Sequence, residues 1–406
     1  MDRLIRTVLS VNEGKTRRDD DFVDRLTRQY TTSILILFAT IVSSKQFVGK
    51  PISCWCPAHF TESHRSYTDN VCWVSNTFYV PFEHRIPGDS EESWQERQKV
   101  SYYQWIPLIL LSQACMAFFP TLVWRFLNIR SGIDMTALMD AGMVCQRGSY
   151  AEIREKTIRY VVNQIDRYLL AQREFQRGCC VDIKNMMSRY CFLVGGKRHG
   201  NYLMVAYLFV KLLYLFNAIG QLFLLDYFLG IEYHMYGIHA AARLLKGEDW
   251  TMSERFPRVT LCNFQIRHQS RVHDYVVQCA LTINLFNEKI FIITWFWLVF
   301  VAIISALNTL QWFARALYWP GQLHYVKKKL RAYEVSHRSK GNLKKFVNYY
   351  LRRDGLFLIR MISINIGEMV AAETLAGLWE NYGPERSRRA TNPGGTSATG
   401  ARLDIV

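Results

Sequence analysis

The stretch FIITWFWLVFVAIISALNTLQW, residues 291–312, contains no charged side chain. A helix that crosses a lipid bilayer needs about 20 mostly apolar residues, because each residue rises about 1.5 Å through a hydrocarbon core about 30 Å thick. Three other windows of the 406-residue chain are also mostly apolar and carry few charges. The sequence therefore predicts an all-α membrane protein with four transmembrane helices, at residues 30–47, 105–127, 202–225 and 290–312.

Basic residues are unequally distributed between the segments that connect these windows. Of the 50 Lys and Arg residues, 35 fall in 1–29, 128–200 and 313–406, and 13 fall in 45–101 and 226–289. Segments rich in Lys and Arg stay on the cytoplasmic side of a membrane. Both termini are therefore predicted to be cytoplasmic. The formal net charge of +16 follows from this orientation and indicates no nucleic-acid partner, because no nucleic-acid-binding motif accompanies it.

These limits divide the rest of the chain into six segments. The cytoplasmic ones are an N-terminal segment at 1–29, a loop at 128–201 and a C-terminal region at 313–383. Two long loops, 48–104 and 226–289, lie outside the cell. The last segment, 384–406, is polar and rich in glycine, and we expect it to be disordered.

The two outside loops hold five cysteines, which are Cys54, Cys56, Cys72, Cys262 and Cys279. The oxidising exterior permits disulfide bonds there. Cys54 and Cys56 are two residues apart, so both project to the same face of an extended segment, and either can be the bonded partner. Four bonded cysteines allow three pairings, and the sequence does not choose among them.

No enzymatic or metal-binding motif is found. The ten histidines form no HExxH sequence and no other metal-ligand spacing. No glycine pattern of a nucleotide-binding loop occurs, and no Ser/His/Asp set can be nominated. The sequence predicts a protein that is not an enzyme and that needs no cofactor or metal.

Several runs of sequence resemble the innexins, the gap-junction and hemichannel family of invertebrates. The outside loops contribute PISCWCPAHF (51–60), CWVSNTFYVP (72–81) and FPRVTLCNF (256–264). The predicted helices contribute YYQWIPLIL (102–110) and INLFNEKIFIITWFWLVFVA (283–302), and the C-terminal region contributes DGLFLIRMIS (354–363). The resemblance covers residues from about 20 to 380 and keeps the order and spacing of all four windows.

The resemblance implies a subunit of a large-pore channel in the plasma membrane. The resemblance also implies four transmembrane helices, a helical cytoplasmic dome and short strands in the outside loops. Disulfides are expected to join the two loops. The innexins' two cysteines per loop match Cys54, Cys72, Cys262 and Cys279, and Cys56 is a departure from that pattern. The implied partners are further copies of the chain in a ring, usually of eight, an opposing ring in the next cell, other innexin subunits and membrane lipids.

Candidate pore-lining residues lie in the first predicted helix and the N-terminal segment. Ser33, Thr40 and Ser44 share one helical face, which is interpreted as facing a watery pore or as a small-residue packing face. Arg3 and Arg6 lie on a short segment that the resemblance places near the pore mouth. There they form a positive annulus that favours anions, or else they belong to a solvated terminus.

Two further cationic features stand out. Lys211 lies in the third window, and no predicted span contains an acidic residue that could pair with it. Snorkelling or a water-filled cleft is the favoured explanation, and a functional role is the alternative. Lys327, Lys328, Lys329 and Arg331 follow the fourth window and are interpreted as a contact with anionic lipid of the inner leaflet or as a solvated helix face.

The sequence thus predicts a channel subunit that passes ions and small metabolites, either between cells as a gap junction or across one membrane as a hemichannel. An undocked hemichannel alone is one alternative, because the extra thiol of Cys56 lies in a loop that would take part in docking. A tetraspan adhesion or scaffold protein without a pore is the other alternative.

Overall fold

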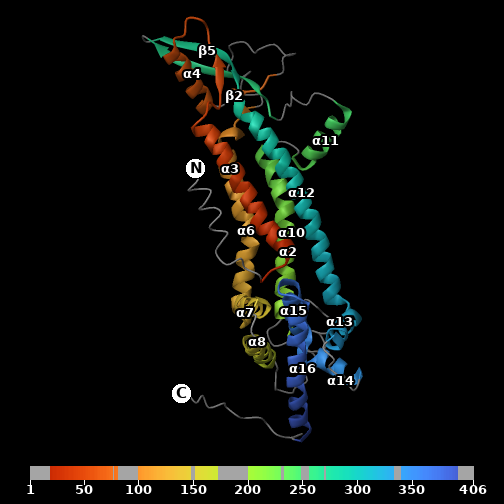
Figure 1. Cartoon of the computed structure of the whole chain (residues 1–406). Coiled ribbons are helices and arrows are strands. Elements are labelled where there is room, and N and C mark those ends of the chain that lie inside the picture. Colours follow the sequence, from red (N-terminus) through yellow and green to blue (C-terminus); the bar gives the residue numbers. More distant parts are fainter. Residues whose placement is uncertain are drawn as a thin grey trace, which may run out of the picture. The chain divides into compact units, whose positions relative to one another are not determined.

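The computed structural model describes residues 19–75, 77–80, 99–147, 151–171, 200–229, 233–247, 256–268, 271–332 and 340–391. The chain forms two compact units. The span unit comprises Val23–Leu122 and Lys211–Asn308, and the tail unit comprises Met1–Phe22, Val123–Val210 and Thr309–Val406. Each unit is assembled from segments that are far apart in the sequence, and three long helices contribute residues to both (Figure 1).

In the described part of the chain, three helices are long and apolar enough to cross a membrane. They are α6 (Ile106–Ser131), α10 (Tyr202–Leu229) and α12 (Thr282–Leu317). The first predicted span corresponds to α3 (Thr31–Phe47), which has only 17 residues. Its apolar run is short because Ser43, Ser44, Lys45 and Gln46 make its end polar. Three of the four predicted spans thus correspond to helices that are long and apolar enough to cross a membrane. That α3 crosses the membrane remains a prediction.

A short helical segment precedes α3 without a break. It consists of α2 (Phe22–Arg25) and a π-helical turn, η1 (Leu26–Tyr30). A π-helical turn holds more residues than an α-helical turn, so it rotates the face that the following helix presents.

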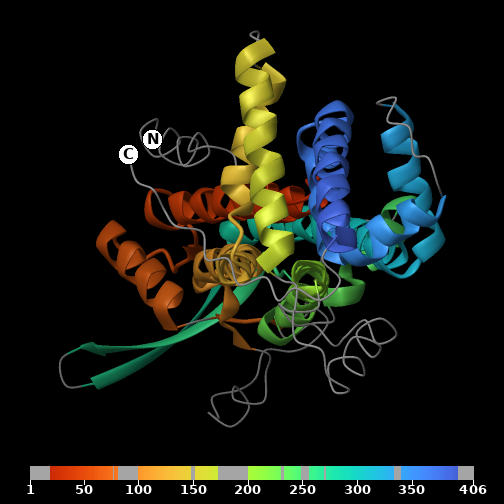
Figure 2. The same ribbon diagram turned by 90° about the horizontal axis from the view of Figure 1, so that it is seen from below.

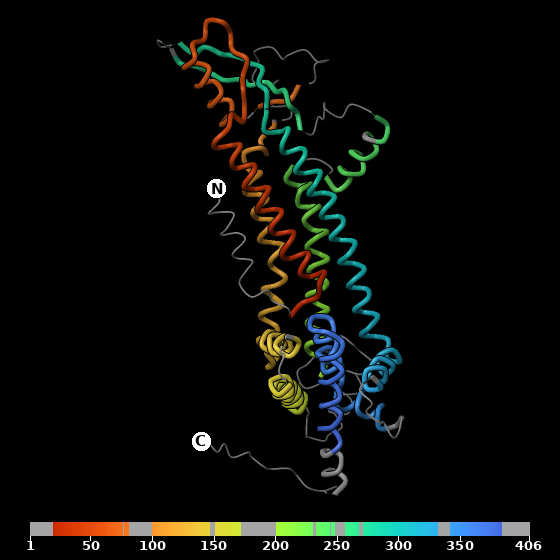
Figure 3. Tube along the Cα trace, in the orientation of Figure 1, coloured from red at the N-terminus to blue at the C-terminus, as the bar shows by residue number. Residues whose placement is uncertain are grey.

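Within the span unit, α3 is hydrogen-bonded to α6 and to α12, and the three helices run along one another in Figure 3. Polar side chains join these helices. The Trp297 indole donates to the Thr31 hydroxyl at 2.9 Å, and the hydroxyls of Thr121 and Tyr214 are 2.7 Å apart. Between membrane helices such hydrogen bonds take the place of a hydrophobic driving force, because lipid tails are as apolar as the side chains.

The two predicted outside loops build one five-stranded antiparallel sheet, in the order β1-β5-β4-β2-β3. The first loop supplies β1 (Ser53–Trp55), β2 (Thr77–Phe78) and β3 (Lys99–Val100). The second supplies the hairpin of β4 (Val259–His268) and β5 (Arg271–Ala280), which is seen clearly in Figure 2. The expectation of short strands is wrong for this hairpin, whose strands have ten residues each and are rich in β-branched side chains.

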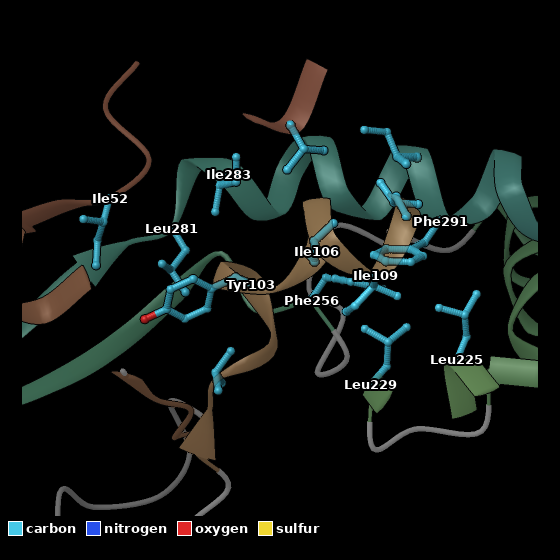
Figure 4. Packing of buried hydrophobic residues seen from close by; sticks show 14 of the residues in the cluster. Ile52, Tyr103, Ile106, Ile109, Leu225, Leu229, Phe256, Leu281, Ile283 and Phe291 are labelled. Carbon is cyan, nitrogen blue, oxygen red and sulfur yellow. The ribbon is translucent and has the colours of Figure 1, made fainter. Parts of the chain in front are cut away.

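Helices also occur in these loops, which the sequence analysis does not predict. They are α4 (Glu62–Ser75), η2 (Tyr102–Gln104), η4 (Tyr233–Met235) and α11 (Tyr236–Lys246). The loops share one hydrophobic core with the adjoining ends of the long helices (Figure 4). Its members include Ile52, Tyr103, Ile106, Ile109, Leu225, Leu229, Phe256, Leu281, Ile283 and Phe291. The loops are therefore a folded part of the span unit.

The tail unit is helical in its described residues, as the resemblance implies for the C-terminal region and the loop 128–201. Besides the ends of α6, α10 and α12, it contains α7 (Met135–Arg147), α8 (Ala151–Ala171), α13 (Trp319–Ala332), α14 (Lys340–Lys345), η5 (Phe346–Leu351), α15 (Arg352–Asn365) and α16 (Glu368–Thr391). Helix α16 extends to Thr391, past residue 384, from which the tail is expected to be disordered, and that expectation remains a prediction. Residues 392–406 lie outside the described part.

Four aromatic rings form the centre of the tail unit. Trp124, Tyr207, Trp312 and Phe357 pack with ring centroids between 5.0 and 6.4 Å apart. Trp312 is fully buried, and its indole donates to a carboxylate oxygen of Asp21 at 2.9 Å. The end of the charged N-terminal segment is thus part of the tail unit's core.

Asp354 anchors the beginning of α10. Its carboxylate accepts hydrogen bonds from the backbone N–H of Met204 and from the hydroxyl of Tyr168, each at 3.2 Å. Its own N–H donates to the carbonyl of Gly200, which has a φ of 68° that glycine adopts without strain. A helix leaves its first N–H groups without partners inside the helix, and a carboxylate there satisfies one of them and favours the helix dipole.

We predict that Asp354→Asn lowers the free energy of unfolding by about 1–3 kcal/mol, because it weakens hydrogen bonds of a fully buried charged acceptor. The thermal unfolding midpoint of the purified protein measures this loss. Asp140→Asn, at an exposed position of α7, is the matched control and should leave the midpoint unchanged. Equal midpoints for the two variants would contradict the anchoring role.

Candidate functional site

Two disulfide bonds join the loops of the span unit. Cys54 on β1 is bonded to Cys279 on β5, and Cys72 on α4 is bonded to Cys262 on β4. Each links residues that are far apart in the sequence, by 225 and 190 positions. The disulfide bonds expected for these loops are therefore present, and the structure selects one of the open pairings.

Both disulfides lie together inside the core of the loops. The sulfur atoms of Cys54, Cys72 and Cys279 all lie within 4.8 Å of one another. This grouping is explained by the two bonds, since bonded sulfurs are not thiolates and thiolates are the metal-binding form. Cys72, Cys262 and Cys279 are completely buried. The bonds therefore tie β1 and α4 to the β4–β5 hairpin.

Cys56, the alternative partner that the sequence leaves open, is a free thiol in the structure. It is buried, with 8% of its surface exposed, and its sulfur donates a weak hydrogen bond to the carbonyl of Cys54 at 3.7 Å. Spacing alone could not separate Cys54 from Cys56. The register of β1 on β5 does so, because it places Cys54 directly opposite Cys279.

The first helical segment has one face against its neighbours and one face away from them. The buried stripe runs along α2, η1 and α3 and consists of Asp24, Thr27, Arg28, Thr31, Leu35, Ala39 and Val42. The candidate pore residues lie on the other side. Ser33 and Thr40 are exposed, Ser44 is half-buried, and Leu37 between them is 53% exposed. Among the helices that the structure describes, none covers this face of α3 in a single chain.

A buried ion pair holds this segment against α10. The ammonium group of Lys211 donates to a carboxylate oxygen of Asp24 at 2.8 Å, and the two side chains are 2% and 3% exposed. Both residues lie in the span unit. A buried charge is tolerated when a partner of opposite sign and further polar contacts surround it.

The structure corrects the interpretation of Lys211 as a snorkelling or cleft-facing cation. None of the four apolar windows contains an acidic residue, and Asp24 lies before the first of them. The run of Asp19, Asp20, Asp21 and Asp24 was a signal of this contact. All four are buried, whereas acidic residues in a solvated terminus would be exposed.

The basic cluster of α13 divides into two kinds of residue. Lys328 and Arg331 are exposed and Lys327 is half-buried, and a contact of these three residues with lipid remains a prediction. Lys329 is buried and forms an ion pair with Glu368 of α16. Burial also lowers the pKa of Lys329, and the charge of Lys328 lowers it further. Lys329 is therefore paired inside the protein, unlike its three basic neighbours. Arg3 and Arg6 lie outside the described residues.

Tyrosine hydroxyls in the outer core act as neutral hydrogen-bond donors. Burial raises the pKa of Tyr103 to about 12, and its hydroxyl donates to the carbonyl of Trp73 at 3.2 Å. Burial also raises the pKa of Tyr233, whose hydroxyl donates to the carbonyl of Phe291 at 2.7 Å. Tyr103 thus joins η2 to α4, and Tyr233 joins η4 to α12. Both hydroxyls stay protonated at physiological pH, so they fit a structural role.

The fold and the site together define a membrane protein of several long apolar helices, with two loops that are cross-linked by disulfides into a small sheet. The family model described as Innexin matches residues 20–382. The chain is 37% identical over 366 residues to "Innexin unc-9" of Caenorhabditis elegans, covering 90% of this chain and 92% of that protein. It is 34% identical over 392 residues to "Innexin-3" of the same organism, covering 94% and 90% respectively. The chain belongs to the innexin family.

Membership of this family gives the general function. The chain is a subunit of the gap-junction and hemichannel class, and the family is located in gap junctions of the plasma membrane. Innexins are channel proteins rather than enzymes, which is consistent with the expectation of a protein without catalytic residues.

We predict that Lys211→Met and Asp24→Leu each destabilise the protein by about 3–5 kcal/mol, because each leaves the other charge buried without its partner. The double variant should recover part of this loss, since it removes both charges. Thermal unfolding midpoints of the purified variants measure the effect. Lys246→Met removes an exposed lysine of α11 in the same unit and should leave the midpoint unchanged. Additive losses in the double variant would mean that the two charges do not stabilise each other.

Proposed function

We propose that the chain forms a ring, most simply of eight copies, whose central pore is lined by the exposed face of α3 and passes ions and small metabolites. The observation that carries this proposal is the asymmetry of α3. One face is buried in the span unit, while Ser33 and Thr40 on the other are exposed in a single chain. Hydroxyl groups on an exposed face of a membrane helix favour contact with water over contact with lipid.

In this proposal α3 also crosses the membrane, which gives four transmembrane helices in total. Four crossings keep both termini in the cytosol, as the distribution of Lys and Arg predicts. The 17 residues of α3 are slightly fewer than a full crossing needs. The preceding α2 and η1 lengthen the helical segment, and the Lys211–Asp24 pair anchors it in the protein.

The sheet and α4 are proposed to meet the same elements of an opposing ring in the next cell. Two disulfides and a shared hydrophobic core hold these loops in one conformation. A preorganised surface binds with a smaller entropic cost than a flexible loop. Exposed polar residues at the end of the hairpin, such as Arg271, His273 and Asp274, give this surface groups for hydrogen bonding.

Cys56 does not favour the undocked hemichannel over the docked channel. Its thiol is buried under the loops and is hydrogen-bonded inside them. It therefore does not present a reactive group to a docking partner. The remaining alternative, a scaffold protein without a pore, shares every feature of the loops and differs only in the role of α3.

Conductance between cells tests the proposal. In paired cells that express only this chain, we expect a current between the two cells. In single cells at lowered external calcium, we expect a leak through undocked rings. Current in single cells alone would overturn the proposed docking of two rings and would still support a pore in each ring. If the protein is shown to be at the cell surface and neither current occurs, a homomeric pore is excluded.

A further inference from the structure

A group of cations surrounds Tyr325 in the tail unit. The guanidinium carbon of Arg360 on α15 lies 5.2 Å from the centre of the Tyr325 ring, and the ammonium nitrogen of Lys329 on α13 lies 5.5 Å from it. Arg315, in the last turn of α12, packs on the Trp312 ring at 5.5 Å and is close enough to repel the charge of Arg360. Three helices thus bring three cations together.

Negative charge does not balance these cations. Among the residues that the structure describes, neither Arg315 nor Arg360 forms an ion pair. Lys329 contacts one oxygen of Glu368, whose other oxygen accepts a hydrogen bond from Ser363 at 2.6 Å. The side chain of Glu368 is 71% exposed. The described residues therefore supply one exposed carboxylate, which pairs with Lys329, and no ion-pair partner for Arg315 or Arg360.

Arg360 bears most of the cost of this arrangement. Its Nη1 atom is buried and has no acceptor within the described part of the chain. Burial lowers the pKa of Arg360, and the charge of Arg315 lowers it further. A guanidinium that is removed from water without an anionic partner is strongly unfavourable. Two arginines that lie close together in this way are typical of an anion-binding site.

We propose that Arg315, Lys329 and Arg360 form a binding site for a phosphate group. The planar guanidinium presents its N–H groups as a fork that matches the oxygens of phosphate, whereas a lysine alone supplies a point charge. Tyr325 holds two of the cations in place through its ring. The proposal concerns the tail unit and does not depend on whether the chain conducts.

The surroundings of Arg315 suggest where the phosphate comes from. Arg315 ends a helix that is long and apolar enough to cross a membrane, and the adjoining Leu317 and Tyr318 are 62% and 64% exposed. Basic pockets on the cytoplasmic side of membrane helices bind the headgroups of anionic lipids. A soluble phosphate ester presents the same chemistry to the same residues, so the experiment must distinguish the two sources.

Binding to the purified full-length protein tests the site. The probes are inorganic phosphate, short-chain phosphatidylinositol bisphosphate and short-chain phosphatidylcholine, and microscale thermophoresis measures the affinity. We expect phosphatidylinositol bisphosphate to bind and phosphatidylcholine not to bind. Arg360→Gln should weaken binding about tenfold or more, because it removes charge-assisted hydrogen bonds. Arg360→Lys, which keeps the charge and loses the fork, should give an intermediate affinity and serves if the glutamine variant does not fold.

Lys344→Gln is the matched control, because it removes one exposed positive charge from α14 in the same unit. It should bind like the natural chain. Inorganic phosphate that binds with the affinity of the lipid supports a soluble phosphate as the source, and a lipid that binds when phosphate does not supports a headgroup. Unchanged affinity in Arg360→Gln, or an equal loss in Lys344→Gln, would overturn the proposal.

Discussion

The ion pair between Lys211 and Asp24 determines which face of the first helical segment is turned toward the other helices. Because both side chains are almost completely buried, separating them removes from each charge its ion-pair partner inside the protein. The pair therefore fixes the rotation of α2 and places Thr31, Leu35, Ala39 and Val42 in the same buried stripe. The hydroxyls of Ser33 and Thr40 are left on the opposite face as a consequence.

The two disulfides fix the segment that follows α3. Pro51, just beyond the end of α3, accepts hydrogen bonds from the backbone of Ile283 and the hydroxyl of Thr282. Cys54, a few residues later, is bonded to Cys279. The helix is thus held by a charge pair before its first turn and by backbone and covalent links after its last. Because α3 is held at both ends, it always presents the same face away from the other helices, as a pore-lining helix must.

The parts of the fold that depend on local composition could be predicted from the sequence. Three long apolar helices follow directly from their windows, and the positions of the bonded cysteines follow from the family resemblance. Contacts between distant segments could not be predicted in this way. Asp24 and Lys211 are 187 residues apart, and the acidic run that contains Asp24 does not indicate which distant residue it contacts. Lys329 belongs to a run of basic residues, and only the packing of α13 on α16 shows that it is paired.

The same limit applies to strands and loops. The ten-residue strands of the β4–β5 hairpin gain their stability from pairing along their length and from the core beneath them, neither of which is a local property. Cys56 shows the reverse case, in which one element of the structure removes an ambiguity. The register of β1 on β5 is sufficient to exclude it as the partner of Cys279.

Chemical modification of α3 during current recording tests most directly whether its exposed face lines a pore. Cys115 of α6 is an exposed free thiol, so every variant carries Cys115→Ser. Ser33→Cys and Thr40→Cys place a thiol on the exposed face of α3, and Val42→Cys places one on the buried face. We predict that a charged, membrane-impermeant thiosulfonate changes the current through the first two variants and leaves the Val42→Cys variant and the Cys115→Ser chain unaffected. Current that is unchanged at both Ser33→Cys and Thr40→Cys would show that this face meets lipid or another subunit, and would contradict the account.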